Sequence, residues 1–305
     1  MKNKHLITLI GPTAIGKTAL SIVLANHFKT DILSCDSRQF YKEMSIGTAV
    51  PSKTELKAAP HHFIQNRSIQ EDYSVGAFEK DAIHLLNELF QQKENLILTG
   101  GSGLYVDAVI KGLDDFPTID KAIRETLKTR LELEGIVPLQ QQLQEVDPFS
   151  FDRIDINNRQ RLIRALEISI GSGKPYSYYL GIHAKKRNFK SIKIGLTAER
   201  EIVYDRINRR VDLMMEHGLL SEAENLYAFR ELNALQTVGY KELFTYFDGD
   251  VSLDFAIEEI KKNTRRFAKR QGTWFRRDPE IKWFDFQTEP TEIIAYIETI
   301  IAQGG

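Results

Sequence analysis

The chain carries the sequence Gly11-Pro12-Thr13-Ala14-Ile15-Gly16-Lys17-Thr18 directly after a short apolar run, Leu6 to Ile10. These residues fit the pattern G-x-x-x-x-G-K-[ST], in which backbone amides, a lysine and a hydroxyl converge on phosphate oxygens. The residues that follow, Ala19 to Phe28, have the apolar spacing of a helix, and the positive N-terminal end of a helix also favours phosphate. A strand, a glycine loop and a helix in this order predict a phosphate-binding loop. An ordinary glycine turn capped by threonine is the weaker alternative.

The phosphate loop predicts a diphosphate or triphosphate ligand but does not identify it. We expect Lys17 to place its charge on the terminal phosphate and the Thr18 hydroxyl to bind Mg²⁺. In kinases and ATPases, an acidic residue at the end of a later core strand helps to hold Mg²⁺. Here the apolar run Leu96–Thr99 ends in Gly100-Gly101-Ser102-Gly103, and the next carboxylate is that of Asp107. ATP is therefore a weaker candidate than another phosphate compound.

Strands and helices alternate around this loop. The expected core strands are short apolar runs, at Leu6–Ile10, Asp31–Cys35, Leu96–Thr99, Ile192–Leu196 and Ile281–Phe286. Helices are expected between them, and the first should turn Leu20, Val23, Leu24 and Phe28 inward. This alternation is typical of an α/β fold with a P-loop NTPase-like parallel sheet covered by helices on both faces.

Residues 116–188 differ from the rest because, from Ile119 to Leu180, they contain only helical spacing. We predict that they form a helical insertion between the two parts of the α/β core, residues 1–115 and 189–305. Helical spacing also dominates from Glu199 to Gln271, so the core is expected to have a helical C-terminal region.

The composition is that of a globular protein of 305 residues, 42% of them hydrophobic and 27% charged. The single cysteine, Cys35, excludes an intrachain disulfide, and its apolar neighbours predict a buried side chain rather than a catalytic thiol. No apolar run approaches the ~20 residues of a membrane helix, and Met1 to His5 lead into a strand rather than a signal-peptide core. We expect a cytoplasmic monomer that does not contact membranes.

Asp36 follows the second expected strand and is the candidate general base. Ligands of open parallel sheets bind beyond the carboxyl ends of the strands, so Asp36 should face the same crevice as Lys17 and Thr18. A carboxylate there can take a proton from an attacking nucleophile. On position alone, a helix cap or an ion pair with Arg38 explains Asp36 equally well.

A basic segment lies near the C-terminus. Residues 261–277 contain no acid and eight basic residues, namely Lys261, Lys262, Arg265, Arg266, Lys269, Arg270, Arg276 and Arg277. A helix face with this charge is typical of proteins that bind RNA phosphates, although a solvated basic helix is the usual alternative. Trp274 can stack on an unpaired base, but a single tryptophan more often belongs to the core.

A second basic cluster, Arg159, Arg161 and Arg164, lies in the expected insertion, on a helix whose packing side is expected to hold Leu162, Ala165 and Leu166. Two such clusters on different parts of the chain predict a grip on opposite sides of an RNA stem-loop. His61 and His62 have no carboxylate or cysteine at ligand spacing, so we expect a structural or substrate-facing pair rather than a zinc site.

Taken together, these motifs resemble those of the tRNA dimethylallyltransferases. The resemblance covers nearly the whole chain in order, through Gly11–Thr18, Asp36–Tyr41, Ile46–Ala49, His61–His62, Gly100–Tyr105, Asn158–Glu167, Arg206–Ile207, Arg210–Val211, Gly218–Leu220, Val238–Lys241 and Ala268–Phe275. Only the phosphate loop is common elsewhere, so the combination is highly specific. One residue departs from the family pattern, because Ser102 stands where the family usually carries threonine.

The resemblance implies that the phosphate loop, Gly11 through Thr18, holds the diphosphate of dimethylallyl diphosphate together with Mg²⁺. At least one of Arg206 and Arg210 would assist, the alternative being surface pairs with Asp205, Asp212 or Glu216. Asp36 would accept a proton from the exocyclic amine of the adenine just 3′ of the anticodon. Lys17 and Thr18 would complete the catalytic set.

The resemblance also implies a tRNA-binding set. It consists of Asp36, Ser37, Arg38, Gln39, Ser102, Arg124, Gln160, Arg161, Leu162, Ile163, Arg164, Lys269, Arg270, Gln271 and Trp274. A stacked base cannot reach a carbon deep in a crevice, so we expect the adenine to be extruded and to enter from the side lined by residues 36–39.

Three other functions stay open on the residues alone. A phosphoryl-transfer enzyme would use Asp36 to activate a hydroxyl, and the long basic C-terminal region argues against it. An RNA-binding protein could use the loop to sense a nucleotide, and the intact loop with Asp36 argues against that. A prenyl transferase acting on free adenine nucleotides would need neither the insertion nor the basic segment.

Overall fold

The computed structural model describes residues 4–181 and 185–303. They form two compact units, one made of Met1–Lys111 and Arg187–Gly305, the other of Gly112–Lys186. The expected insertion is 116–188. The second unit starts four residues before the start of that range and ends two residues before its end. Residues 1–3 and 182–184, on which the expected N-terminal start and part of that insertion fall, lie outside the described residues.

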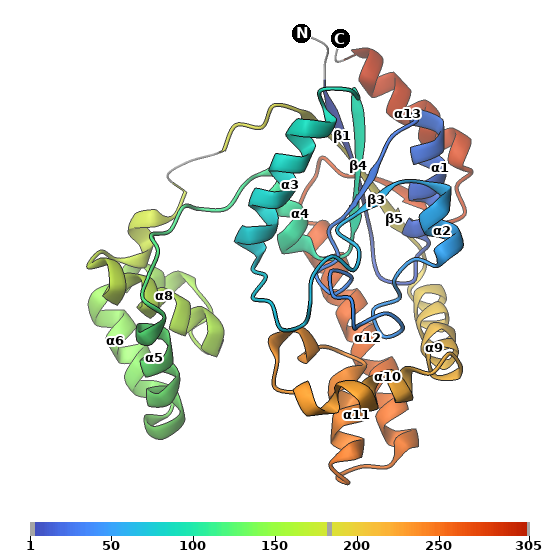
Figure 1. Cartoon of the computed structure of the whole chain (residues 1–305). Helices are drawn as coiled ribbons and strands as arrows, with labels where there is room; N and C mark the ends of the chain where they lie inside the picture. The colour runs from blue at the N-terminus through green and yellow to red at the C-terminus, as the bar shows by residue number, and fades with distance from the viewer. Residues whose placement is uncertain (1–3, 182–184, 304–305) are drawn as a thin grey trace. The chain divides into compact units, whose positions relative to one another are not determined.

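The first unit is built on a six-stranded sheet in the order β3-β2-β4-β1-β5-β6 (Figure 1). Every pair of neighbouring strands is parallel. The strands are β1 (His5–Ile10), β2 (Ile32–Ser34), β3 (His61–His62), β4 (Asn95–Gly100), β5 (Lys190–Thr197) and β6 (Lys282–Asp285). The α/β fold with a P-loop NTPase-like parallel sheet is therefore confirmed, and β3 is an additional edge strand.

Helices cover both faces of this sheet because successive side chains of a strand point to opposite faces. Ile7 and Leu9 of β1 belong to a core shared with α1 (Lys17–Phe28) and α13 (Pro290–Gln303). Leu6 and Ile10 belong to the opposite core, shared with α3 (Val75–Leu89), α4 (Gly103–Ile110) and the end of α12 (Leu253–Phe275). Figure 1 shows α1 and α13 on one side of the sheet and α3 and α4 on the other.

The expected inward face of α1 is wrong at one position. Leu20 and Leu24 are buried, but Val23 is 40% exposed. The buried face instead continues through Ser21 and Ala25. It therefore follows the pairs 20/21 and 24/25, which lie one helical turn apart.

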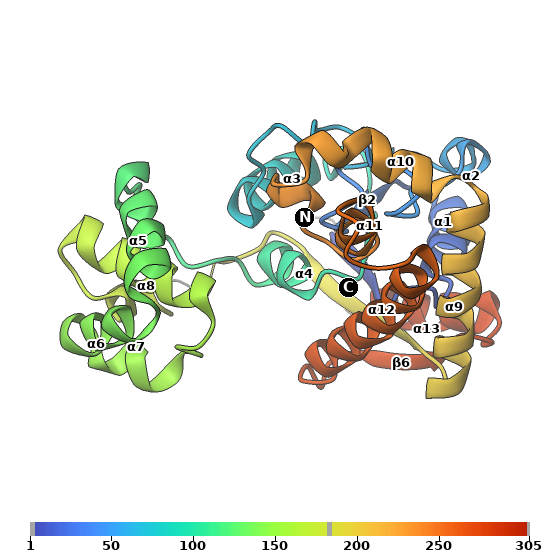
Figure 2. The same cartoon turned by 90° about the horizontal axis from the view of Figure 1, so that it is seen from below.

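The remaining helices of the first unit form a third core beyond the carboxyl ends of the strands. α9 (Arg200–Glu216), α10 (Leu219–Leu226), α11 (Tyr240–Phe247) and α12 pack against one another around Tyr240 and Leu243 (Figure 2). A short helix, α2 (Lys53–Ala58), begins at the capping residue Ser52. None of the helices in the described part of the chain is long and apolar enough to cross a membrane.

In its described residues, the second unit is a bundle of four α-helices with a core of its own. These are α5 (Lys121–Glu134), α6 (Val137–Val146), α7 (Pro148–Arg153) and α8 (Arg159–Ser172). Leu127, Leu139, Leu143, Leu162 and Leu166 are each at most 2% exposed and form the centre of that core.

Candidate functional site

The phosphate loop joins β1 to α1 at the carboxyl end of the sheet. Gly16 is the residue before the helix and has a φ of 111°, a left-handed conformation that glycine adopts without steric penalty. Lys17 turns back over the loop, and its Nζ donates to the carbonyl oxygens of Gly11 at 3.0 Å and of Pro12 at 2.8 Å. The lysine is thus held within the loop by the loop's own backbone.

The pKa of Lys17 is lowered to about 8, chiefly because burial disfavours its charged form. The charge of Asp36 acts in the opposite direction, and that of Arg210 adds to the lowering. An arriving phosphate would supply the negative charge that this ammonium lacks, so phosphate binding should raise the pKa of Lys17.

This titration predicts that phosphate binding weakens in alkaline solution. Above pH 8 the free protein loses the Lys17 proton, while the complex keeps it, so binding takes up a proton. We expect the dissociation constant of an organic diphosphate to rise by up to about tenfold per pH unit between the free and bound pKa values. Calorimetric titration at pH 8.5 in buffers of different ionisation enthalpy would count the proton.

Lys17→Arg is the matched control, because arginine stays protonated across this range. Its binding should show no proton uptake at pH 8.5. Equal uptake by both proteins would assign the proton to another group.

Two arginines of α9 reach the phosphate loop. Arg206 Nε donates to the carbonyl oxygen of Ala14 at 2.7 Å, and Arg210 Nη1 lies 3.4 Å from the Thr13 hydroxyl. Two of the three alternative partners are engaged elsewhere, since Asp205 pairs with Arg209 and Asp212 with Lys261. The structure therefore brings both predicted arginines to the loop.

Asp36 lies two residues after the end of β2. Its Oδ1 accepts the backbone N–H of Arg38 at 3.1 Å, in a turn over residues 37–40 and not at the start of a helix, so the helix-cap alternative is wrong. The guanidinium of Arg38 does not pair with it and donates instead to the carbonyl oxygens of Asn233 and Ala234. Arg38 thus ties this turn to the segment before α11.

Two cavities meet at Asp36. The smaller, about 560 Å³, contains the phosphate loop from Thr13 to Thr18 and both arginines. The larger, about 780 Å³, is lined by Ser37, Arg38, Ser102, Lys241, Asn263, Arg270, Trp274 and others. Four residues line both, namely Thr13, Asp36, Thr48 and Arg210. A group transferred from a phosphate compound in one cavity to an acceptor in the other would pass beside the Asp36 carboxylate.

Gln39 does not lie on the side expected for RNA. It lines the smaller cavity, and its amide donates to the carbonyl oxygens of Thr48 and Ala49 at 3.3 and 3.0 Å. Ser102 does lie on the expected side, where its hydroxyl accepts the backbone N–H of Ser37 at 3.2 Å. Ser102, which stands where the family usually has threonine, therefore links the turns after β2 and β4 through its hydroxyl.

The basic segment on α12 divides into two parts. Lys261 pairs with Asp212 and Glu258, Lys262 with Glu259, and Arg265 donates to Asn208. By contrast, the side chains of Lys269 and Arg270 are exposed. The run of charges is thus partly structural, and its second half is the part that faces solvent.

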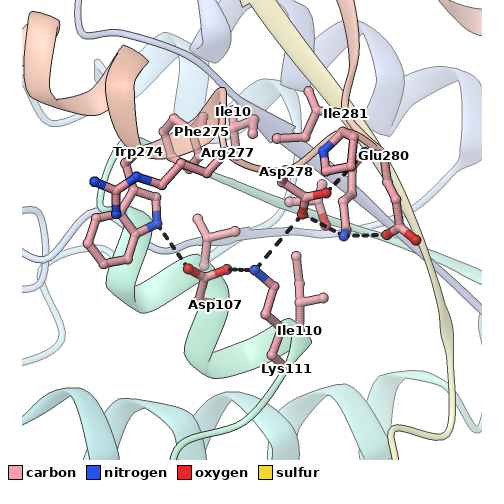
Figure 3. Close-up of a pocket in the computed structure, with 14 residues that line it drawn as sticks. Ile10, Asp107, Ile110, Lys111, Trp274, Phe275, Arg277, Asp278, Glu280 and Ile281 are labelled. Atoms are coloured by element: carbon pink, nitrogen blue, oxygen red, sulfur yellow. Dashed lines mark hydrogen bonds and ion pairs between the residues drawn. The ribbon is translucent and has the colours of Figure 1, made fainter. Parts of the chain in front are cut away.

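Trp274 is anchored as a packing residue. Its indole Nε1 donates to Asp107 at 2.9 Å, and the ring also lines the larger cavity. Figure 3 shows another cavity beside it, where Asp107 pairs with Lys111. This cavity has a volume of about 330 Å³, and Lys193 in its lining pairs with Asp278 and Glu280. Carboxylates neutralise both lysines of this cavity, so these two cations are not available to a phosphate.

In the second unit, the expected RNA residues fall into three groups. Gln160 and Arg161 are exposed at the start of α8. Arg124 and Arg164 share the Glu167 carboxylate, at 3.0 and 3.2 Å. Leu162 is fully buried and Ile163 is 6% exposed, which corrects the expectation that these two side chains contact RNA, because both fill the core.

Sequence reasoning missed a carboxylate that holds the loop between the two cavities. Glu222 of α10 accepts the backbone N–H groups of Ser45, Ile46 and Gly47, at 2.8 to 2.9 Å, and the Tyr240 hydroxyl at 2.7 Å. These bonds fix the turn that leads into Thr48. The neighbouring motifs Gly218–Leu220 and Val238–Lys241 pointed to this region but not to the contact.

Comparisons with known proteins agree with this geometry. The family model described as IPP transferase matches residues 39–278. A tRNA dimethylallyltransferase of Flavobacterium johnsoniae is 60% identical over 300 residues, which is 96% of this chain and 97% of that protein. A tRNA dimethylallyltransferase of Bacteroides fragilis is 49% identical, over 99% of this chain and all of that protein.

Solved structures are similar over the same length. The full-length tRNA isopentenylpyrophosphate transferase of Bacillus halodurans is 38% identical with a TM-score of 0.73, over 99% of this chain and 98% of that one. A eukaryotic dimethylallyltransferase acting on tRNA is 25% identical with a TM-score of 0.86, over 99% of this chain and 80% of that one.

Proposed function

This chain belongs to the tRNA dimethylallyltransferases, the IPP transferase family, and we propose that it modifies the adenosine 3′-adjacent to the tRNA anticodon. It transfers a dimethylallyl group from dimethylallyl diphosphate to the N6 amine of that base and releases diphosphate. The observation that supports this most strongly is Asp36, which lines both the phosphate cavity and the larger cavity beside it.

The leaving group is held by the phosphate loop. As the allylic C–O bond breaks, negative charge grows on the diphosphate. The loop amides, Lys17 and the two α9 arginines then stabilise it more strongly than in the ground state. Because Arg206 and Arg210 contact the loop itself, they are already in place before the ligand arrives.

The acceptor amine requires a base. As N6 forms its bond to the allylic carbon, it becomes more acidic, and Asp36 takes its proton. The Arg38 N–H holds one carboxylate oxygen of Asp36 and thereby orients the group. No covalent enzyme intermediate is needed.

We propose Mg²⁺ as the metal, which the Thr18 hydroxyl in the phosphate cavity would hold together with the substrate diphosphate. Within residues 4–181 and 185–303, no group of three or more His, Cys, Asp or Glu residues is placed to hold a metal ion. The phosphate cavity therefore suits an ion that would take most of its ligands from the substrate and water. When bound, it would neutralise charge on the leaving diphosphate.

tRNA binds on the side of the larger cavity in this proposal, and the enzyme acts as a cytoplasmic monomer. Anticodon-loop bases are unpaired, so extruding the adenine is inexpensive. Ser37, Arg38 and Ser102 line that cavity, together with Arg270 from the exposed half of the α12 charges.

The exposed charges of α12 give a second prediction. Replacing both Lys269 and Arg270 with glutamine should weaken tRNA binding and lower its salt slope by about 0.7 to 0.9 for each phosphate interaction removed. Binding of dimethylallyl diphosphate should not change. Filter binding across a salt titration measures both effects on RNA.

Lys80 and Lys282, exposed on α3 and β6, provide the control for net charge, because neither lines the two cavities. Their double glutamine variant should bind tRNA like the wild type. If the Lys269/Arg270 variant did so too, the α12 face would be only a solvated surface.

One incubation separates this function from its rivals. The protein is mixed with labelled dimethylallyl diphosphate, ATP, AMP and unmodified tRNA, and the products are resolved. We expect the label on tRNA alone. Label on AMP would indicate the free-nucleotide enzyme, and phosphate transfer from ATP would indicate a kinase.

A further inference from the structure

The Gln271 side chain joins the turns after two neighbouring strands. It comes from α12 and is 6% exposed. Its Oε1 accepts the backbone N–H of Thr13 at 2.9 Å, in the phosphate loop after β1. Its Nε2 donates to the carbonyl oxygen of Gly101 at 2.9 Å, in the turn after β4.

The fit around this amide is tight. A Cβ on residue 101 would lie 2.2 Å from Gln271 Nε2, so only glycine leaves room for the side chain. Each bond uses the atom of the amide that has the right polarity, an oxygen toward N–H and a nitrogen toward C=O. A buried amide with both ends bonded defines a single orientation.

Gln271 therefore fixes the first half of the phosphate loop. The backbone N–H of Thr13 donates to Gln271, and its hydroxyl lies beside Arg210. Thr13 also lines both cavities. The next residue, Ala14, is held through its carbonyl oxygen by Arg206. Side chains from α12 and α9 thus set the loop's shape before a ligand arrives, which reduces the entropy cost of binding.

We propose that Gln271 is a positioning residue for the diphosphate site, acting through Thr13, and that it is not an RNA contact. The proposal rests on the proposed function, since it requires a diphosphate in the loop. It also reassigns a residue of the expected tRNA-binding set, whose neighbours Lys269 and Arg270 face solvent while Gln271 faces the loop.

Gln271→Glu tests the role with almost no change in shape. An ionised carboxylate still accepts from Thr13 but repels the Gly101 carbonyl oxygen. At pH 8 we expect dimethylallyl diphosphate to bind about 10- to 100-fold more weakly, the usual range for a buried acceptor left without its donor. The tRNA dissociation constant should stay unchanged.

Lowering the pH supplies a readout that a purely structural role would not produce. Once protonated, the introduced carboxyl can donate to Gly101 and restore both bonds. The affinity of the Gln271→Glu variant for dimethylallyl diphosphate should therefore recover toward pH 5.5. Gln271→Met, which has no titrating group, should stay weak throughout. Gly101→Ala, which crowds the same amide from the other side, should bind weakly too, and it keeps the test decisive if one variant does not fold.

The outcomes are distinct. Normal diphosphate binding with weakened tRNA binding in the variants would make Gln271 an RNA contact and overturn the proposal. A lower melting temperature with both affinities normal would leave only a structural role and would also overturn it. Failure of the wild-type protein itself to bind dimethylallyl diphosphate would instead contradict the proposed function.

Discussion

Asp36→Asn should slow dimethylallyl transfer by about 10²- to 10⁴-fold, the usual contribution of a general base. The asparagine side chain has the same shape, and its oxygen can still accept the Arg38 N–H that the carboxylate accepts at 3.1 Å. The turn after β2 should therefore persist. What the amide cannot do is take a proton from N6.

The rate must be measured in a single turnover with saturating tRNA and dimethylallyl diphosphate, so that product release does not hide the chemical step. Both dissociation constants should stay within about threefold of the wild type, because the substituted atom is one of many that line each cavity. Asp254→Asn, at an exposed position in the first turn of α12, controls for the removal of one carboxylate. A near-normal single-turnover rate for Asp36→Asn would show that Asp36 is not the general base.

Lys17→Ala should lower the rate by about 10²- to 10³-fold, comparable with the removal of one transition-state donor. The wild-type ammonium donates to two loop carbonyl oxygens and has a pKa of about 8, because burial disfavours its charge. Folding therefore works against this charge, whereas the leaving diphosphate requires it. We expect the variant to melt at an unchanged or higher temperature while it loses activity.

Thermal unfolding with ligand provides the measurement. Dimethylallyl diphosphate should raise the melting temperature of the wild type and raise that of Lys17→Ala much less. Thr18→Ala should mainly increase the Mg²⁺ concentration needed, and Lys80→Ala should behave like the wild type. tRNA binding should be unchanged in all three. Protection by ATP and not by dimethylallyl diphosphate would favour a kinase.

The sequence predicts the sheet well because its central strands are buried on both faces. Such strands are short apolar runs, and β1 is fully buried along its length. The edge strand β3 is not predicted, because its two residues are histidines and do not form an apolar run. The predicted burial of Val23 is wrong for a related reason, since apolar spacing locates the buried face of α1 only to within part of a helical turn.

The candidate site is less predictable, because its side chains meet across long sequence separations. The phosphate loop is contiguous, so a pattern finds it. The bond between Thr13 and Gln271 joins residues 258 apart, and no local pattern indicates it. For Leu162 two sequence signals disagree: helical spacing places it on the packing side, whereas the family motif places it in the tRNA-binding set. The structure agrees with the spacing, because the side chain lies in the core. Half-buried polar partners such as Glu222 emerge only when the fold brings α10 to residues 45–47.

The strand order also bears on how the chain folds as it is synthesised. β1 is flanked by β4 and β5, and β5 is made only after the whole of the second unit, Gly112–Lys186. Until β5 has been synthesised, one edge of β1 therefore stays unpaired in the nascent sheet. During that interval the second unit, which has its own core, can already fold. We expect the bundle to resist proteolysis first on the ribosome, and the phosphate loop to become ordered only once α12 has emerged to supply Gln271.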